Sequence, residues 1–154
     1  MSKLEVLLVG SPREMQQVLA VRRRVFIEEQ GVPEDIEIDQ HDVVLRGDIE
    51  RAGAQHVLAM LDGRPVATGR LVLEDAGGRP HIGRVAVMPE HRGRGFGRAV
   101  MAGLHDLARK RGATAVTLAA QLHAIGFYEK LGYKARGEVF LDAGIEHRWM
   151  DIEL

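Results

Sequence analysis

Residues 85–98, with the sequence VAVMPEHRGRGFGR, join an apolar run typical of a strand to the start of an amphipathic helix. The second half of this stretch is rich in glycine and arginine, which stand at Arg92, Gly93, Arg94, Gly95, Gly97 and Arg98. Glycine lets a backbone turn tightly and approach a ligand closely. The first turn of a helix offers unpaired N–H groups at the positive end of its dipole. The stretch therefore predicts an anion site that suits a pyrophosphate.

Close helix packing and two kinds of nucleotide-binding loop are the alternatives at this glycine-rich turn. Glycines can serve only to let a helix pack closely, and here the strand-loop-helix context and the arginines favour the anion. A Walker loop would need Gly-Lys-Ser/Thr after its second glycine, which is missing. A dinucleotide fold would need G-x-G-x-x-G near the start of its first strand-helix-strand unit. Here the spacing is G-x-G-x-G, and four predicted strands precede it.

Length and composition narrow the functional classes. The 154 residues suffice for one domain with a sizeable core. A formal net charge of -1 gives no support to a nucleic-acid or membrane-surface role. The chain has no cysteine, so disulfides, thiolate nucleophiles and cysteine metal sites are excluded. Residues 1–10 lack the long apolar stretch of a signal peptide, and we expect a cytoplasmic protein.

Periodicity and turn signals predict one mixed α/β sheet in a single domain over residues 1–154. Ser11-Pro12-Arg13-Glu14 has the pattern of a capping box, and Asp62-Gly63 is a strong hairpin signal. The predicted strands cover residues 4–9, 56–61, 65–74, 82–88, 114–120, 133–141 and 146–154, and the predicted helices cover 11–30, 96–111 and 123–131. Residues 34–42 are expected to form an acidic connection, and residues 43–53 a loop or short helix.

Several motifs together resemble one family. Residues 92–97 match the Arg/Gln-x-x-Gly-x-Gly/Ala motif of the GNAT superfamily of N-acetyltransferases, and Val85-Ala86-Val87 resembles its cofactor-binding strand. Residues 127–133, FYEKLGY, resemble its second motif. Residues 21–42 and 120–123 are similar to the ElaA-like branch. The resemblance covers most of the chain and implies a mixed, mostly antiparallel sheet of about seven strands, with splayed central parallel strands flanked by helices.

The resemblance also implies a reaction, in which acetyl-CoA gives its acetyl group directly to a primary amine. It places the pyrophosphate on residues 92–98 and the pantetheine arm along the preceding strand. The backbone N–H of Val87 would polarise the thioester carbonyl. The cofactor-binding residues implied in this way are Val85, Ala86, Val87, Arg92, Gly93, Arg94, Gly95, Phe96, Gly97, Arg98, Gln121 and Phe127.

The sequence indicates the catalytic acid and base less completely than the cofactor-binding residues. Tyr128 stands where the family has its general acid, although an aromatic ring filling the core beside Phe127 is the alternative. Some relatives carry a glutamate at the place of His81, so the base stays open. A histidine has a suitable pKa, but one next to Pro80 at a strand start is also consistent with simple exposure. His123 and His147 reach the site or are ordinary turn residues.

The acceptor is expected to be a small-molecule or peptide amine. Acidic residues lie near the loop that walls the acceptor site in the family, and Glu28, Glu29 and Asp39, with Glu37, are candidates. Acidic runs are commonly just solvated, so this hint of a cationic acceptor is weak. The histidines show no metal-ligand spacing, and we predict no metal. A non-catalytic acyl-CoA sensor and a longer-chain acyltransferase are the alternatives, and a homodimer stays open.

Overall fold

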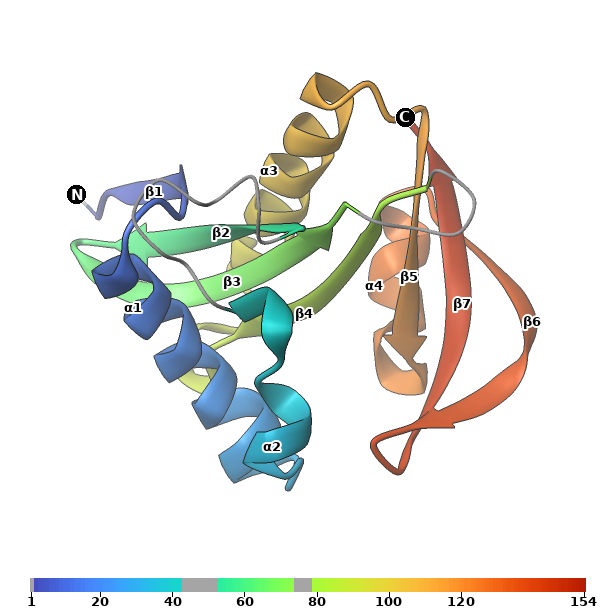
Figure 1. The fold of residues 1–154 in the computed structure, drawn as a ribbon, viewed down its shortest axis with the longest axis horizontal. Coiled ribbons are helices and arrows are strands. Elements are labelled where there is room, and N and C mark those ends of the chain that lie inside the picture. The colour runs from blue at the N-terminus through green and yellow to red at the C-terminus, as the bar shows by residue number, and fades with distance from the viewer. Residues whose placement is uncertain (1, 43–52, 74–78) are drawn as a thin grey trace.

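A computed structural model describes residues 2–42, 53–73 and 79–154 and shows one mixed sheet with helices on both faces (Figure 1). The strands are β1 (Leu4–Leu8), β2 (Ala54–Leu61), β3 (Arg64–Val72), β4 (His81–Val87), β5 (Ala115–Gln121), β6 (Lys134–Asp142) and β7 (Ile145–Glu153). They lie in the spatial order β1-β2-β3-β4-β5-β7-β6. This confirms the predicted seven-stranded α/β fold.

Helices cover the sheet on opposite sides, with α1 and α2 in front and α3 and α4 behind in Figure 1. The helices are α1 (Pro12–Arg22), its π-helical continuation η1 (Arg23–Glu29), α2 (Glu34–Glu37), α3 (Phe96–Lys110) and α4 (Ile125–Lys130). Short 3₁₀ turns form η2 (Gln40–Asp42), η3 (Pro89–His91) and η4 (Leu122–Ala124). The acidic stretch 34–42 was therefore wrongly predicted as a plain connection, because α2 and η2 lie within it. The predicted segment 43–53, apart from Gly53, lies outside the described residues.

The local signals act as predicted at both the first helix and the hairpins. Ser11 Oγ accepts a hydrogen bond from the Glu14 N–H at 3.1 Å, and Glu14 Oε1 accepts one from the Gly10 N–H at 2.7 Å. Asp62 and Gly63 both have positive φ, at 51° and 79°, as a tight two-residue hairpin turn requires.

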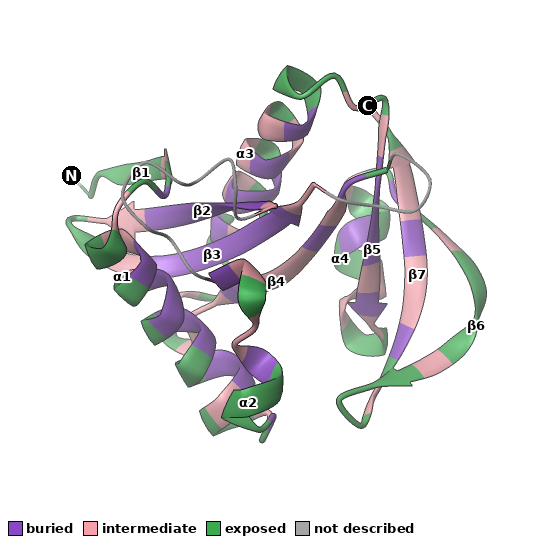
Figure 2. Ribbon diagram, viewed as in Figure 1, coloured by how far each residue is buried: buried purple, intermediate pink, exposed green. Residues whose placement is uncertain are grey.

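The two faces of the sheet bury separate clusters (Figure 2). On the α3 face, the buried stripe contains Phe96, Val100, Met101, Leu104 and Ala108. The α1 face buries Met15, Val18 and Leu19 against Leu58. Gly69 on β3 makes room for α3, because a Cβ there would lie 2.8 Å from a Leu104 methyl and 2.9 Å from a Val100 methyl.

The central feature of the sheet is a gap between its two parallel strands. Strands β4 and β5 pair only at His81 with Thr117 and at Ile82 with Leu118. Beyond these two positions the strands diverge, although β4 continues to Val87. This confirms the predicted splay, which leaves one backbone edge of β4 without a neighbouring strand.

A β-bulge in β4 lies beside this gap. Thr68 pairs with Ala86 and Arg70 pairs with Gly83, so Arg84 and Val85 together oppose a single residue of β3. Arg84 adopts a φ of 52°, a left-handed conformation that is costly for a residue with a side chain. The strand therefore bends and re-aims its side chains where it leaves its parallel neighbour.

Candidate active site

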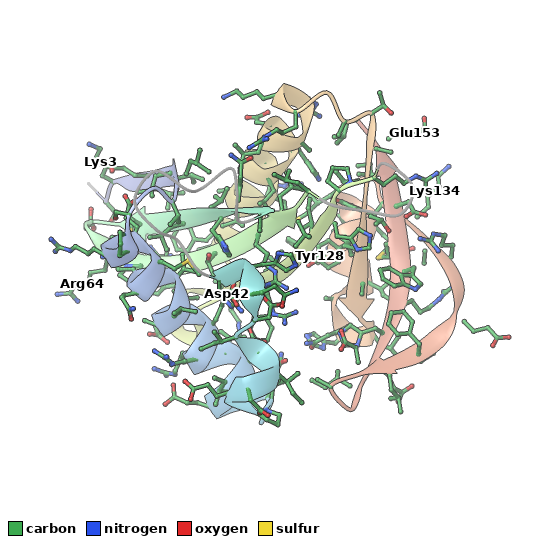
Figure 3. All side chains as sticks on the ribbon, viewed as in Figure 1. Lys3, Asp42, Arg64, Tyr128, Lys134 and Glu153 are labelled. Atoms are coloured by element: carbon green, nitrogen blue, oxygen red, sulfur yellow. The ribbon has the colours of Figure 1, made fainter. Side chains whose placement is uncertain are left out.

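A cleft of about 1160 Å³ occupies the gap between β4 and β5. Its walls come from η1, α2, β4, the start of α3, β5, α4 and the β6–β7 hairpin. Tyr128, which Figure 3 shows near the gap, comes from α4, and Asp42 lies on the α2 side among charged side chains. One cleft thus brings together segments from both halves of the chain.

The glycine loop lies at one end of the cleft and starts α3. Gly93 and Gly95 have φ values of 76° and 85°, which side chains rarely adopt, and Gly95 is the N-cap of α3. Both residues line the cleft together with Gly97. No heavy atom of the described residues lies within 4 Å of the place where a Gly95 Cβ would stand. The backbone at the positive end of α3 is therefore accessible to an anion from the cleft.

Arg92 connects this loop to the end of β4. Its Nε donates to the Val87 carbonyl oxygen at 3.2 Å, and its two terminal nitrogens bind the Glu29 carboxylate at 2.8 and 2.5 Å. The Met88 N–H bonds to Val66 on β3, so strand alternation turns the N–H and C=O of Val87 the other way, into the gap. Arg92 thus binds the edge of β4 at the open end of the gap.

The other two arginines of the loop differ in position. Arg94 stacks over the Phe96 ring at 5.1 Å and lies 3.2 Å from His91 Nδ1, and it is not part of the cleft wall. Arg98, exposed in the first turn of α3, lines the cleft and has no ion pair with any residue of the described ranges. Of the three, Arg98 is the one that lines the cleft without an ion-pair partner among the described residues.

Two glutamines join the opposite arm of the sheet to η1. Gln30 Nε2 donates to Gln121 Oε1 at 3.2 Å, and Gln121 Nε2 donates back to Gln30 Oε1 at 2.8 Å. Glu29, the neighbour of Gln30, holds Arg92 and through it the end of β4. These four residues, Glu29, Gln30, Arg92 and Gln121, form what we call the cleft bridge, because they tie together the ends of two strands that no longer pair.

Tyr128 is a largely buried aromatic residue in the cleft wall. The residue is 9% exposed, and its ring packs edge-on against Phe127 at 5.0 Å and Tyr133 at 5.7 Å. The hydroxyl makes no hydrogen bond to the residues that the structure describes, yet the residue lines the cleft. Burial raises the pKa of Tyr128 to about 12. At neutral pH the phenol is therefore protonated and can donate a proton.

His81 lies at the closed end of the gap, where β4 still pairs with β5. Its ring meets Trp149 of β7 edge-on at 5.8 Å, and both residues line the cleft. His123 and His147 also line it, although His147 Nδ1 lies 2.7 Å from the Ile145 carbonyl oxygen. Whether any of these histidines takes a proton from the acceptor stays a prediction.

A buried charge cluster lies between α1, α2, η2 and the sheet. It consists of Arg22, Glu37, Asp39, Asp42, Arg70 and Arg84. Arg22 is 1% exposed and binds Glu37 at 2.9 Å and Asp42 at 2.5 Å. Burial raises the pKa of Glu37, against the pull of Arg84 and Arg22.

Asp39 is fully engaged within this cluster. Its carboxylate receives both terminal nitrogens of Arg70 at 2.8 Å and the His41 N–H at 3.0 Å. Burial alone would raise the pKa of Asp39, but the hydrogen bonds and charge of Arg70 lower it. Glu29 is likewise held by Arg92. Of the four acidic residues that were predicted to receive the acceptor, Glu29, Glu37 and Asp39 thus already have guanidinium partners.

Most of the predicted site residues meet in the cleft wall. Those that line it are Glu29, Asp39, His81, Val85, Ala86, Val87, Arg92, Gly93, Gly95, Phe96, Gly97, Arg98, Gln121, Phe127 and Tyr128. Arg94 and Glu28 do not. Sequence patterns missed Gln30, Arg70, Arg84 and Trp149, which also line it, because long-range pairing and a bulge bring them there and no local motif marks them.

Neither a metal-binding cluster nor a membrane-spanning helix occurs among the described residues. Within residues 2–42, 53–73 and 79–154, no group of three or more histidine, aspartate and glutamate side chains could hold a metal ion. No helix in this described part of the chain is long and apolar enough to cross a membrane.

The chain is similar in sequence and in structure to proteins of a known family. Residues 15–133 match the model of the acetyltransferase (GNAT) family. The uncharacterized N-acetyltransferase YjcF of Bacillus subtilis is 33% identical over 96% of this chain and 98% of its own length. The crystal structure of an acyl-CoA N-acyltransferase from Pseudomonas aeruginosa has a TM-score of 0.78 at 29% identity, covering 97% of this chain and 99% of that one. Escherichia coli ElaA has a TM-score of 0.78 at 26% identity, covering 98% and 99%.

Proposed function

This chain belongs to the acetyltransferase (GNAT) family, and we propose that it transfers the acetyl group of acetyl-CoA to a primary amine. The observation that carries the proposal is the arrangement in one cleft of an unpaired strand edge, a glycine loop at a helix start and a protonated tyrosine. Each of these three features suits a different part of an acyl-CoA molecule. A location in the cytoplasm is part of the same proposal.

The residues of the cleft fit acyl-CoA as a substrate. The loop from Gly93 to Gly97 offers backbone N–H groups to the pyrophosphate, and Arg98 adds an accessible positive charge. The pantetheine arm has amides that can pair with the open edge of β4 at Val85 and Val87. Arg92 has two proposed roles at this site. It fixes the end of β4 through its hydrogen bond to the Val87 carbonyl oxygen, or it releases Glu29 and binds a phosphate oxygen instead.

The proposed chemistry needs three groups of the protein. The amine nitrogen attacks the thioester carbonyl carbon, a C–N bond forms and the C–S bond breaks. The Val87 N–H, which points into the gap, stabilises the charge that develops on the carbonyl oxygen. Tyr128 gives its proton to the departing sulfur. The amine must lose a proton to react, and His81, on the wall of the same cleft, is the proposed acceptor of that proton.

A non-catalytic acyl-CoA sensor is the alternative function. A sensor has no need of a protonated phenol in the cleft wall, and Tyr128 therefore favours the enzyme. A panel of primary amines incubated with acetyl-CoA, with detection of the free thiol of CoA, tests the two. The proposal expects amine-dependent release of CoA. Tight binding of acetyl-CoA without release by any amine would favour the sensor.

A further inference from the structure

Arg84 is a charged cleft residue that the proposed chemistry does not use. It stands in the β4 bulge, directly before Val85, and its side chain is 24% exposed. Its backbone is left-handed, a conformation that is costly for a residue with a side chain. Strained backbone of this kind occurs often at functional sites, so we expect its side chain to have a role there.

The contacts of Arg84 leave one side of its guanidinium open. Nε lies 3.2 Å from Glu37 Oε1 and 3.3 Å from the Glu37 carbonyl oxygen. Nη2 lies 3.4 Å from the Ile36 carbonyl oxygen and 3.6 Å from Asp39 Oδ2. The hydrogen bonds of Arg84 to the described residues use Nε and Nη2 and leave Nη1 without one. The guanidinium thus reaches towards α2 and retains donors for a further acceptor atom.

The carboxylates around Arg84 are already paired. Glu37 is shared with Arg22, Asp39 is shared with Arg70, and Asp42 is bound by both of these arginines. The cluster contains three arginines and three carboxylates, so it has no net negative charge to repel an anion. Burial, followed by the nearby charge of Arg70, lowers the pKa of Arg84.

We propose that Arg84 binds a carboxylate of the acceptor, and that the acceptor is a free α-amino acid. This inference rests on the proposed function, because it concerns the amine that the same cleft would acylate. Arg84 adjoins Val85, and the open edge of β4 begins there. An acceptor held by the guanidinium has its amine beside the thioester only when the carboxylate and the amine are close together in the molecule. Arginine suits this task because its planar donors match a carboxylate.

The proposal separates three kinds of amine. A free amino acid has the carboxylate next to the amine, a peptide N-terminus has an amide there, and a polyamine has no anionic group. Because a hydrogen bond to a charged group contributes about 1.5–3 kcal/mol, the carboxylate should raise kcat/KM about tenfold to a hundredfold over the matched amide. Polyamines should be poorer still, since the nearby carboxylates already have partners.

The first experiment uses the unaltered protein. A panel of amino acids and their carboxamides is incubated with acetyl-CoA, and the N-acetyl products are quantified by mass spectrometry. We expect a preference of at least tenfold for the acids over their own amides. Equal rates, or faster reaction of the amides, would overturn the inference about Arg84 and leave the proposed acetyl transfer intact. If no amine in the panel were acetylated, the proposed function itself would fail.

The second experiment changes the guanidinium. Arg84→Gln should bring the ratio of acid to amide close to one, and Arg84→Lys should restore part of it. Arg64→Gln, at the exposed start of β3, is the control and should keep the ratio. Retained acetyl-CoA affinity and a cooperative thermal transition show that a variant is folded. An undiminished ratio in folded Arg84→Gln contradicts the proposal.

A binding measurement keeps the inference testable without turnover. Isothermal titration of the best amino acid and its carboxamide, with CoA present, should show the same preference for the acid. If Arg84→Gln failed to fold, this titration and the rates of the unaltered protein would still show whether the site prefers the acid to its carboxamide. Equal affinities of acid and amide would overturn the assignment.

Discussion

Gln30 and Gln121, 91 positions apart in the chain, exchange two hydrogen bonds across the cleft. Gln121 ends β5, and Gln30 follows Glu29, which holds the β4 side through Arg92. The cleft bridge therefore closes a gap that backbone pairing leaves open. We expect it to set the separation of the two strands where acyl-CoA enters.

A double-mutant cycle tests this role of the bridge. Gln30→Ala and Gln121→Ala should each weaken acetyl-CoA binding, and the double variant should lose little more than either one, because each single change removes both hydrogen bonds. The coupling free energy between the two glutamines, obtained from the free energies of unfolding in urea, should be about 0.5–1.5 kcal/mol per hydrogen bond. Gln16→Ala, exposed on α1, is the matched control. Additive effects would mean that the two amides do not act together.

Replacement of Gly95 tests the anion site. Its φ of 85° makes any side chain costly by about 1–2 kcal/mol, but no protein atom stands in the way of a Cβ. Gly95→Val should therefore keep most of the fold and abolish measurable CoA binding in isothermal titration. Gly126→Ala, in α4 with open space around it, should bind normally. Unchanged affinity in folded Gly95→Val would remove the pyrophosphate from this loop.

Tyr128→Phe tests the general acid. The variant should lower kcat by about 10²–10⁴-fold, because the proton matters chiefly in the transition state, and leave acetyl-CoA affinity nearly unchanged. Tyr133→Phe removes a hydroxyl that bonds to His105 at 2.6 Å and should affect stability more than kcat. A fall in affinity with kcat intact would mean that Tyr128 only holds the substrate.

The pH profile gives a second test of Tyr128. A general acid works while it is protonated, that is, below its pKa, and burial raises this pKa to about 12. The alkaline fall in kcat due to Tyr128 should therefore begin only near that pH, and any fall near neutrality must come from another group. An alkaline limb near pH 10 that disappears in Tyr128→Phe would show a phenol with the ordinary pKa.

Asp42 makes the stability of the fold dependent on acid. Burial alone would raise its pKa, but Arg22 holds it below the ordinary value of 3.8. The unfolded chain then binds the proton more readily, so the contribution of Asp42 is complete well above pH 3.8 and is lost as the pH falls below it. Asp42→Asn should flatten the acid limb of stability measured by urea unfolding. It should also cost about 3–5 kcal/mol at neutral pH, because the buried Arg22 loses one of its two carboxylate partners and keeps only Glu37. An unchanged acid limb would contradict the assignment.

The elements that the sequence predicted correctly are those with local sequence signals. The cap at Ser11, the hairpin at Asp62-Gly63 and the glycine start of α3 depend on neighbouring residues, and the structure has all three. The short helix α2 was missed because its four residues, EDIE, show no helical period, and Arg22 and Arg84 hold it through Glu37. The π-helical η1 was also missed, since its residues continue the apolar pattern of α1.

The candidate site likewise contains residues that local motifs mark and residues that only the fold brings there. The glycine loop and Tyr128 have local motifs, and the cleft wall includes them. Arg84 reaches the cleft through a bulge that depends on pairing with β3, and Gln30 through a partner in β5. Of the acidic candidates, Glu29, Glu37 and Asp39 line the cleft and Glu28 does not, and their arginine partners could not be seen without the fold. The electrostatics of the acceptor side therefore follow from the structure alone.

A crystal structure with acetyl-CoA bound is the most direct test of the account. The predicted result has the pyrophosphate against the backbone N–H groups of residues 93–97 and the pantetheine arm along Val85 and Val87. It also has the thioester sulfur within hydrogen-bond reach of the Tyr128 hydroxyl. A cofactor bound outside the gap between β4 and β5, or a sulfur remote from Tyr128, would contradict the proposed acetyl transfer.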